Sequence, residues 1–405
     1  MVERYGELLI ISINTITMKP NIKFLKKEQN IGKQIAIYCA GTHGLLFAQV
    51  LEKCQIKTDI FFDSNNNKWG EEIYEGIFCA NPYKVADKNN YIVFICIAPD
   101  YYEETQKQVQ SIGFQNIVNF NCILDDIILN MPLLYLELIH LYQNMPAADL
   151  FYTPLANNNI FYEEEWNYDS SDKIAIYTGI FGDYDKICEP QVFPENIDYY
   201  FISDNKPENL SAFQWIDAQT VIPSDIISPI KRNRYIKMHP HLLFPEYKYS
   251  IYIDGNIIIK EDITSFIKKN LSGIAAFMHP RRDCLFYEAI TIVNFRRVVA
   301  DDVCKQMKKY LEEGMPLHYG LPEMPVIARE HYNPLCIQVM ETWWKEFDTE
   351  AQRDQLSFMY AMWKNGLSLM DMSSLGNDAH KNEFIAFNHH FCESKFLFNE
   401  KNEIC

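Results

Sequence analysis

The chain has 405 residues, of which 48% are hydrophobic, and its formal net charge is −17. A chain of this length and composition can bury a large core and is longer than most single domains, so we expect two domains. Its negative field repels a phosphate backbone, and no stretch rich in lysine and arginine reverses that field locally. This excludes nucleic acids and anionic membranes as main partners. A small anionic substrate is still compatible, because a few local cations can hold it.

The cysteines and the longest apolar runs bear on the cellular compartment. Eleven cysteines are present without a C-x-x-C pair or another zinc-binding spacing. Three of them, Cys39, Cys79 and Cys96, lie inside apolar strand-like runs, where a thiol behaves as a small hydrophobe. We therefore expect reduced cysteines in a cytoplasmic protein. The apolar runs at 8–16 and 131–142 are too short or too polar for a signal peptide or a transmembrane helix.

Short apolar runs alternate with amphipathic stretches in the first part of the chain. Strands are expected at residues 34–40, 60–63, 91–98 and 116–120, and helices at 44–54 and 101–113. This alternation is typical of βαβ units and predicts a parallel sheet. The expected fold class is thus α/β, beginning with a Rossmann-like domain.

The domain boundaries follow from changes in composition. We expect an N-terminal extension over 1–30 and a Rossmann-like domain over 31–146, which includes an apolar bridging helix at 125–143. The stretch 147–172 is rich in asparagine, tyrosine and acidic residues and has little periodicity, which is typical of a linker. A second α/β domain is expected over 173–398. Its expected elements are a strand opening the run at 173–182, strands at 197–203 and 249–259, and a long helical tract at 335–366.

A glycine turn separates the first expected strand from the first expected helix. Gly41 and Gly44 would let the backbone approach a phosphate at the helix N-terminus. Asp63 ends the next strand, near the place of the ribose-binding acid in dinucleotide folds. These three residues are candidates for nucleotide binding. The alternative is a turn that only packs, since Cys39 stands where the first glycine of the motif should be.

This first part of the chain resembles the Rossmann-like domains attached to bacterial sugar-modifying enzymes and sugar acyltransferases. The resemblance is carried by the G-x-x-G turn, the strand ending in F-F-D with an asparagine-rich loop at 63–67, and the small-residue strand end at 98–100. An NAD-dependent sugar-modifying enzyme centred on this turn is therefore one alternative function. The domain lacks an evident Tyr-x-x-x-Lys pair that such chemistry would use.

A second constellation places an acid at the end of a strand. The apolar run at 249–253 is followed by Asp254, Gly255 and Asn256. Two oxygen-bearing side chains at i and i+2 can share one hard cation, and that cation can bridge a diphosphate. In isolation this tripeptide is better explained as a hairpin turn.

The surroundings of this turn carry a more specific resemblance. A strand with a glycine-containing loop (173–185), a strand ending in Asp204 and Asn205, and a basic segment at 229–247 precede the turn. Together they resemble the glycosyltransferase-like domain of the plant turgor-regulation and mucilage-related family, which has bacterial relatives and belongs to the GT-A class. Later segments that match the same family are H-P-R-R-D-C-L-F-Y-E-A at 279–289, I-A-R-E-H at 327–331, W-W-K-E at 343–346 and R-D-Q-L-S-F-M-Y at 353–360.

The resemblance implies a GT-A-like domain that binds a nucleotide-sugar donor. It makes Tyr177, Thr178, Gly179 and Asp204 candidate contacts of the base and ribose. Cations toward the diphosphate would come from three residues on one predicted helix: Arg232, Arg234 and Lys237. A helical spacing puts Arg234 and Lys237 on one face. The structural alternatives are a strand–turn, a helix cap and surface salt bridges.

The resemblance also implies a divalent cation, Mn²⁺ or Mg²⁺, as cofactor. Asp254 is its strongest candidate ligand, with Asn256 in place of the usual second acid and His389 as a late histidine ligand. Asp354 and Gln355 resemble the motif near the reaction centre, and Glu330 is a third candidate catalytic residue. His279, Arg281, Glu288 and His331 are candidates to line the sugar pocket or to form buried ion pairs.

The sequence thus predicts a glycosyltransferase that moves a sugar from a nucleotide-sugar donor to a glycan or glycoconjugate acceptor. A non-catalytic nucleotide-sugar-binding protein is an alternative, favoured by Asn256. No base for the acceptor can be placed from sequence, so retention or inversion is left open. Homo-oligomerisation is left open as well.

Overall fold

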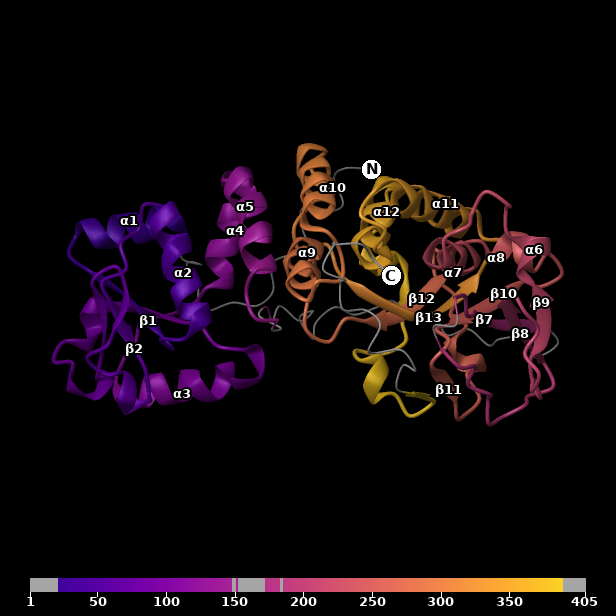
Figure 1. Cartoon of the computed structure of the whole chain (residues 1–405), viewed down its shortest axis with the longest axis horizontal. Helices are drawn as coiled ribbons and strands as arrows, with labels where there is room; N and C mark the ends of the chain where they lie inside the picture. The colour runs from indigo at the N-terminus through magenta and orange to yellow at the C-terminus, as the bar shows by residue number, and fades with distance from the viewer. Residues whose placement is uncertain (1–20, 148–150, 152–171, 183–184, 389–405) are drawn as a thin grey trace. The chain divides into compact units, whose positions relative to one another are not determined.

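The computed structural model describes residues 21–147, 151, 172–182 and 185–388. The chain divides into two compact units, Met1–Tyr135 and Leu136–Cys405 (Figure 1). Each unit contains its own sheet, and each is described separately below. Among the described residues, no helix has both the length and the apolar character needed to cross a bilayer.

The first unit is a parallel α/β layer structure. Its strands are β1 (Gln34–Tyr38), β2 (Ile60–Phe62), β3 (Glu72–Tyr74), β4 (Ile77–Ala80), β5 (Tyr91–Ile95) and β6 (Ile117–Asn119). Its helices are α1 (Ile22–Asn30), α2 (Thr42–Lys53), α3 (Tyr102–Ile112) and α4 (Asn121–Asn130). The sheet order is β3-β4-β2-β1-β5-β6, and every neighbouring pair except β3–β4 is parallel. This is the doubly wound strand order, so the expected α/β class with a parallel sheet is confirmed.

Local chemistry explains why these elements end where they do. Helix α3 ends at Gly113, whose φ of 109° is the left-handed conformation that glycine adopts without strain. The expected single bridging helix at 125–143 is wrong. The chain forms α4 and then α5 (Pro132–Gln143), because Pro132 has no backbone N–H with which to continue the first helix.

The second unit is built on a seven-stranded mixed sheet in the order β14-β12-β13-β10-β7-β8-β9. Its strands are β7 (Ile174–Gly179), β8 (Ile197–Ser203), β9 (Gln214–Asp217), β10 (Tyr249–Ile253), β12 (Ile274–Met278), β13 (Pro322–Glu330) and β14 (Ser373–Ser374). Strands β10, β7, β8 and β9 are mutually parallel, and β13 is antiparallel to both β10 and β12. The carboxyl end of β10 therefore lies beside the start of β13.

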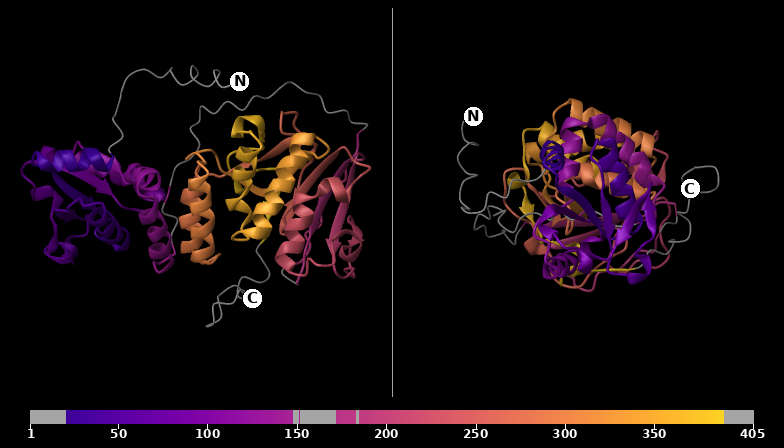
Figure 2. Two further views of the ribbon diagram at one scale, coloured as in Figure 1. Left: turned by 90° about the horizontal axis from the view of Figure 1, so that it is seen from above. Right: turned by 90° about the vertical axis from the view of Figure 1, so that its left-hand side faces the viewer.

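The second unit also contains helices (Figure 2). They are α6 (Ala218–Val221), α7 (Pro229–Met238), α8 (Pro240–Leu243), α9 (Leu285–Asn294), α10 (Ala300–Glu312), α11 (Pro334–Thr349) and α12 (Phe358–Lys364). Helix α7 contacts β7, and α11 contacts both α7 and α12. Between α11 and α12 lies a short 3-10 helix, η7 (Asp354–Leu356), so the helical tract expected at 335–366 is interrupted there.

The segment expected as a strand at 249–259 is divided between two sheets. Strand β10 belongs to the large sheet, whereas β11 (Ile257–Ile259) pairs with β15 (Ile385–Phe387) in a separate two-stranded sheet. The turn at Asp254, Gly255 and Asn256 is therefore not a hairpin turn. It carries the chain out of the large sheet at the carboxyl end of a fully buried strand.

Candidate functional site

Asp254 is held at the carboxyl end of β10. Its backbone N–H donates to the carbonyl of Pro325 at 2.8 Å, and its Oδ1 accepts a hydrogen bond from the Tyr252 hydroxyl at 3.0 Å. A Cβ on Gly255 would lie 2.7 Å from Cγ1 of Ile180, so only glycine allows this close approach. Within the described part of the chain, Oδ2 of Asp254 accepts no hydrogen bond, which leaves it available to a ligand.

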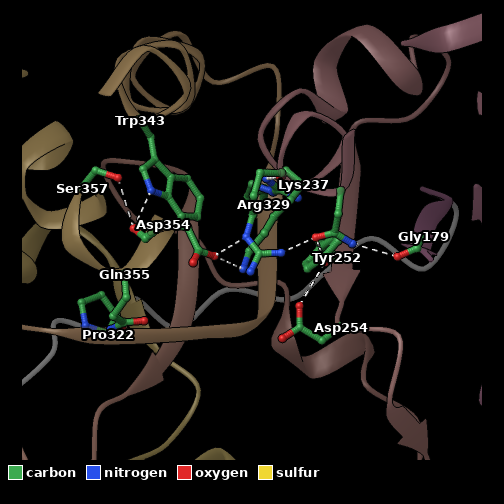
Figure 3. Close-up of polar contacts among 12 residues, drawn as sticks. Gly179, Lys237, Tyr252, Asp254, Pro322, Arg329, Trp343, Asp354, Gln355 and Ser357 are labelled. Atoms are coloured by element: carbon green, nitrogen blue, oxygen red, sulfur yellow. Dashed lines mark hydrogen bonds and ion pairs between the residues drawn. The ribbon is translucent and has the colours of Figure 1, made fainter. Parts of the chain in front are cut away.

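A buried ion cluster lies beside this carboxylate. Helix α7 presents Arg234 and Lys237 on one face, and both contact Oδ2 of Asp354, at 2.9 and 2.7 Å (Figure 3). The sequence-based expectation that these two cations share a face is thus met. Burial alone would raise the pKa of Asp354, but Arg234 and Lys237 hold that pKa well below its usual range. Asp354 is therefore ionised.

Asn233 connects the cluster to both neighbouring strands. Its Nδ2 donates to the carbonyl of Gly179 at 2.8 Å, and its Oδ1 accepts from the Tyr252 hydroxyl at 3.3 Å and from Arg234 (Figure 3). Tyr252 in turn contacts Asp254. The carboxyl ends of β7 and β10 are thus linked through one amide, which sequence inspection did not single out.

The backbone of η7 is fixed from two sides. The indole N–H of Trp343 donates to the carbonyl of Asp354 at 2.9 Å, and Nε2 of Gln355 donates to the carbonyl of Pro322 at 2.7 Å (Figure 3). Asp354 thus faces the cations of α7, while Gln355 faces the start of β13. Trp343 is fully buried.

A polar cavity of about 240 Å³ lies next to η7. Its lining combines charged groups from the loop after β12, helix α9, the start of β13 and the residues around η7: His279, Arg282, Glu288, Thr291, Ile292, Phe295, Arg297, Glu323, Arg353 and Gln355. Within it, Nε of Arg282 contacts Oε2 of Glu288 at 2.7 Å. Burial would raise the pKa of Glu288, but the Arg282 guanidinium lowers it below its usual range.

Glu323 is the residue of this cavity that the sequence did not reveal. Burial, together with the nearby carboxylates of Asp378 and Glu288, raises its pKa to about 7. Its Oε2 is buried and has no hydrogen-bond partner within the described part of the chain. The only local signal was a glutamate between two prolines at the start of a strand, which has no chemical specificity.

Some predicted donor contacts lie in the core instead. Tyr177 is fully buried, and its hydroxyl accepts from Arg329 at 2.6 Å and donates to the carbonyl of Ile236 at 3.1 Å. Gly179 packs against α7, where a Cβ would lie 2.3 Å from Cδ1 of Ile236. Both are structural in this conformation, because α7 covers β7. Thr178 is buried too, but none of the described residues forms a hydrogen bond with its Oγ1.

Asp204 and Arg232 form an ion pair with each other at the carboxyl end of β8. The Arg232 guanidinium also lies 5.3 Å from the ring centre of Phe181, in the loop after β7. The structure therefore brings the acid, the cation and the glycine-containing loop together. Each of the two charged side chains keeps part of its surface exposed.

The other predicted sugar-pocket residues are split between two places. His279 and Glu288 line the cavity. Glu330 does not, because it pairs with Tyr249 at the amino end of β10, at the opposite end of the sheet strand from Asp254. His331 follows it, fully buried, with Nε2 3.3 Å from the carbonyl of Phe244. Neither reaches the site, because antiparallel β13 carries them away from it.

Of the three predicted metal ligands, the structure describes Asp254 and Asn256. His389 lies outside the described residues. Asn256 is buried, and its Nδ2 donates to the carbonyl of Asn388 at 3.1 Å, which ties β11 to β15. The described residues contain no group of three His, Cys, Asp or Glu side chains able to hold a metal. Asp254 and Asn256 retain side-chain oxygens of the kind that hard cations prefer, so they fit a cation that takes further ligands from a diphosphate.

In the first unit, the glycine turn has a structural explanation. A Cβ on Gly44 would lie 2.3 Å from the carbonyl oxygen of Cys39, so packing of α2 on β1 requires glycine, whereas Gly41 faces open space. Asp63 is buried and accepts from the backbone N–H of Ala40 at 2.9 Å and from Lys68 at 2.8 Å. Its carboxylate thus fixes the turn.

Comparison with known proteins gives one family. Residues 158–390 match the family model described as TOD1/MUCI70, glycosyltransferase-like domain. A relative from Arabidopsis thaliana, named "Probable hexosyltransferase MUCI70", is 23% identical over 248 residues, which cover 55% of this chain and 42% of that protein. The aligned part thus spans less than half of the relative's length.

Solved structures that are similar to this chain have low sequence identity and low TM-scores. The galactosyltransferase LgtC with donor and acceptor sugar analogues is 13% identical, with a TM-score of 0.29 over 49% of this chain and 72% of that chain. The bifunctional glycosyltransferase WbbM is 15% identical, with a TM-score of 0.30, and the match covers 68% of this chain and 52% of that chain. The glycosyltransferase GlyE of Streptococcus pneumoniae is 14% identical, with a TM-score of 0.27, and the match covers 50% of this chain and 45% of that chain.

Proposed function

Because the chain belongs to the TOD1/MUCI70 glycosyltransferase-like domain family, we propose that it transfers a sugar from a nucleotide-sugar donor to a glycan or glycoconjugate acceptor. The donor site would lie in the domain expected over residues 173–398. Its cellular setting would be polysaccharide biosynthesis in the cytoplasm.

One observation carries the proposal. The carboxyl end of β10 presents the Asp254 carboxylate next to a turn, and a cluster of two cations and one carboxylate lies beside it (Figure 3). Open α/β sheets bind ligands at the carboxyl ends of their parallel strands. The cations can bind a diphosphate directly, and the carboxylate of Asp254 can bind it through a divalent cation.

The residues present suggest how the leaving group is stabilised. Arg234 keeps part of its side chain exposed, whereas Lys237 is buried beneath it against Asp354. Arg234 would therefore face the diphosphate directly, and Lys237 would add positive potential from below. Lys237 and Asp354 also fix the position of Arg234.

A divalent cation is part of the proposal. Asp254 would be its first protein ligand, followed by Asn256 and His389, and the cation would neutralise charge on the departing diphosphate. Arg232, Asp204 and the loop after β7 would contact the nucleoside, since they meet at the carboxyl ends of β7 and β8. Thr178, with its unpartnered hydroxyl, would assist there.

The test is a transfer assay on the full chain. Purified protein is incubated with a panel of nucleotide sugars, with and without Mn²⁺ or Mg²⁺, and with oligosaccharide acceptors; nucleotide release and glycan extension are both measured. Acceptor-dependent nucleotide release with one donor supports the proposal. Donor binding by calorimetry without any release, under every cation, would instead support a binding protein.

A further inference from the structure

We propose that Glu323 is the catalytic base that takes the proton from the acceptor hydroxyl, and that the cavity lined by Glu323, Arg353 and Gln355 seats the reacting sugar ring of the acceptor. This inference rests on the proposed function and assigns it a residue and a subsite. It also implies direct displacement at the anomeric carbon, with inversion of configuration.

The cavity has the size and chemistry of a subsite for one small polyol. Its volume is about 240 Å³, below the roughly 300–1,000 Å³ of sites for drug-sized ligands. Most of its lining residues carry polar side chains from four separate elements. A single ring with several hydroxyl groups can use such a surface, whereas an apolar ligand would leave it unpaired.

Two buried polar atoms of the lining lack hydrogen-bond partners among the residues that the structure describes. Oε2 of Glu323 accepts no hydrogen bond, and Nε of Arg353 donates none. One is an acceptor and the other a donor, and both residues line the same cavity. Unpaired buried groups of this kind cost free energy unless a ligand satisfies them. A hydroxyl-bearing ligand, which donates and accepts, would complement both.

The cavity adjoins the proposed donor site along two elements. Glu323 lies two residues before Pro325, and the carbonyl of Pro325 accepts a hydrogen bond from the backbone N–H of Asp254. Two residues of a strand span about 7 Å, which is the separation of Glu323 from Pro325 along β13. In η7, Gln355 lines the cavity while its neighbour Asp354 binds the cations of α7. A sugar in the cavity would therefore lie beside a donor held at Asp254.

The charges around Glu323 suit a base that works near neutral pH. Asp378 and Glu288 raise its pKa, and Arg282 and the backbone N–H of Ala379 lower it. Nε2 of His279 lies 3.9 Å from Oε1 of Glu323, and burial lowers the pKa of that histidine to about 4, so it stays neutral. Nδ1 of His279 accepts the backbone N–H groups of Arg281 and Arg282, and its Nε2 lies 3.1 Å from Nη2 of Arg282.

The acceptor oxygen bonds to the anomeric carbon of the donor while its proton passes to Oε2 of Glu323. The bond from that carbon to the diphosphate breaks, and its electron pair leaves with the diphosphate. The proton on Glu323 then returns to solvent.

The test compares Glu323→Gln with the wild-type chain and with Glu312→Gln, a control at an exposed carboxylate on α10. We expect kcat of Glu323→Gln to fall about 10²- to 10⁴-fold, the usual contribution of a general base, with donor affinity by calorimetry unchanged. The acidic limb of the wild-type pH profile of kcat/KM should have a midpoint near 7 and should vanish in Glu323→Gln. The sugar product should have inverted anomeric configuration.

Each other outcome has a definite meaning. If the wild type transfers sugar and the Glu323→Gln variant does so at the same rate, the assignment of Glu323 as the base is overturned, but the proposed function is not. A retained anomeric configuration would do the same. A wild type that neither binds nor turns over any nucleotide sugar would overturn the proposed function and this inference with it. If the variant fails to fold, a wild-type profile without a limb near pH 7 still refutes the assignment.

Discussion

Oδ2 of Asp354 accepts a hydrogen bond from Nζ of Lys237 at 2.7 Å, and both side chains are almost wholly buried. The pair joins η7 to α7 across 117 residues of sequence. Burial lowers the pKa of Lys237, while Asp354 and Asp254 oppose that change. This contact places the predicted reaction-centre motif against the predicted cationic helix.

Replacing Asp354 should be strongly destabilising. In Asp354→Asn, Arg234 and Lys237 would remain buried without their anionic partner. Removing one member of a buried ion pair typically costs about 3–5 kcal/mol. Urea unfolding at pH 7 should show a loss of this size in the free energy of unfolding, and a loss below about 1 kcal/mol would contradict the account.

The matched control is Asp348→Asn. Asp348 pairs with Lys231 of the same helix α7 at 2.6 Å, but its side chain is 40% exposed. Exposed pairs contribute about 0–1 kcal/mol. Because the pKa of Asp354 is depressed on folding, the cost of Asp354→Asn should be complete at pH 7 and should shrink as pH falls below about 4.

Glu323→Gln should change stability in a pH-dependent way. Burial raises the pKa of Glu323 to about 7, so wild-type folding takes up a proton between about pH 4.5 and 7 and loses stability as pH rises through that window. Glutamine does not titrate. The variant should thus equal the wild type near pH 4.5 and exceed it by on the order of 2–3 kcal/mol at pH 8. The measurement is Tm of the wild type and of Glu323→Gln across this pH range. A variant that is less stable than the wild type at pH 8 would contradict the argument that burial raises the pKa of Glu323.

Gly179→Ala tests the packing of α7 on β7. The added Cβ would lie 2.3 Å from Cδ1 of Ile236 and 2.9 Å from the carbonyl oxygen of Ile202. Overpacking of this kind costs about 1–3 kcal/mol. Gly41→Ala is the comparison, because Gly41 faces open space with a φ of −109°. Thermal unfolding should show a clear loss only for Gly179→Ala, and equal behaviour of the two would contradict the packing described.

Glu330→Gln tests whether Glu330, at the end of β13 away from Asp254, takes part in sugar transfer. Glu330 resembles a catalytic residue in sequence but pairs with Tyr249 at the end of β10 away from Asp254. We expect its transfer rate to equal that of the wild type. A loss of more than about tenfold in kcat, with Tm unchanged, would show that the sequence-based assignment was correct.

The fold was largely predictable because its strands are continuous apolar runs. Strand β8 was expected at 197–203 and has those bounds, and Gly113 ends α3 as its position suggested. The errors arose where local signals compete with tertiary pairing. Asp254 and Asn256 look like a hairpin turn, but the strands on either side belong to different sheets.

The site was predictable only for residues whose local pattern carries chemistry. The helical spacing of Arg234 and Lys237 placed them on one face, and Asp254 followed an apolar strand. Glu323 and Asn233 could not be found in this way. Their importance comes from burial and from contacts with residues far away in sequence, such as Glu288, Asp378 and Gly179.

Donor binding at Asp254 is the central claim, and thermal-shift titration tests it most directly. Wild type and Asp254→Ala are titrated with nucleotides and nucleotide sugars, with and without Mn²⁺ or Mg²⁺. A ligand that binds the native state raises Tm by mass action. We predict a cation-dependent increase with one nucleotide sugar that is lost in Asp254→Ala. An absence of any increase with nucleotide sugars, together with an NAD-induced increase that survives the substitution, would contradict the account and move the function to the first unit.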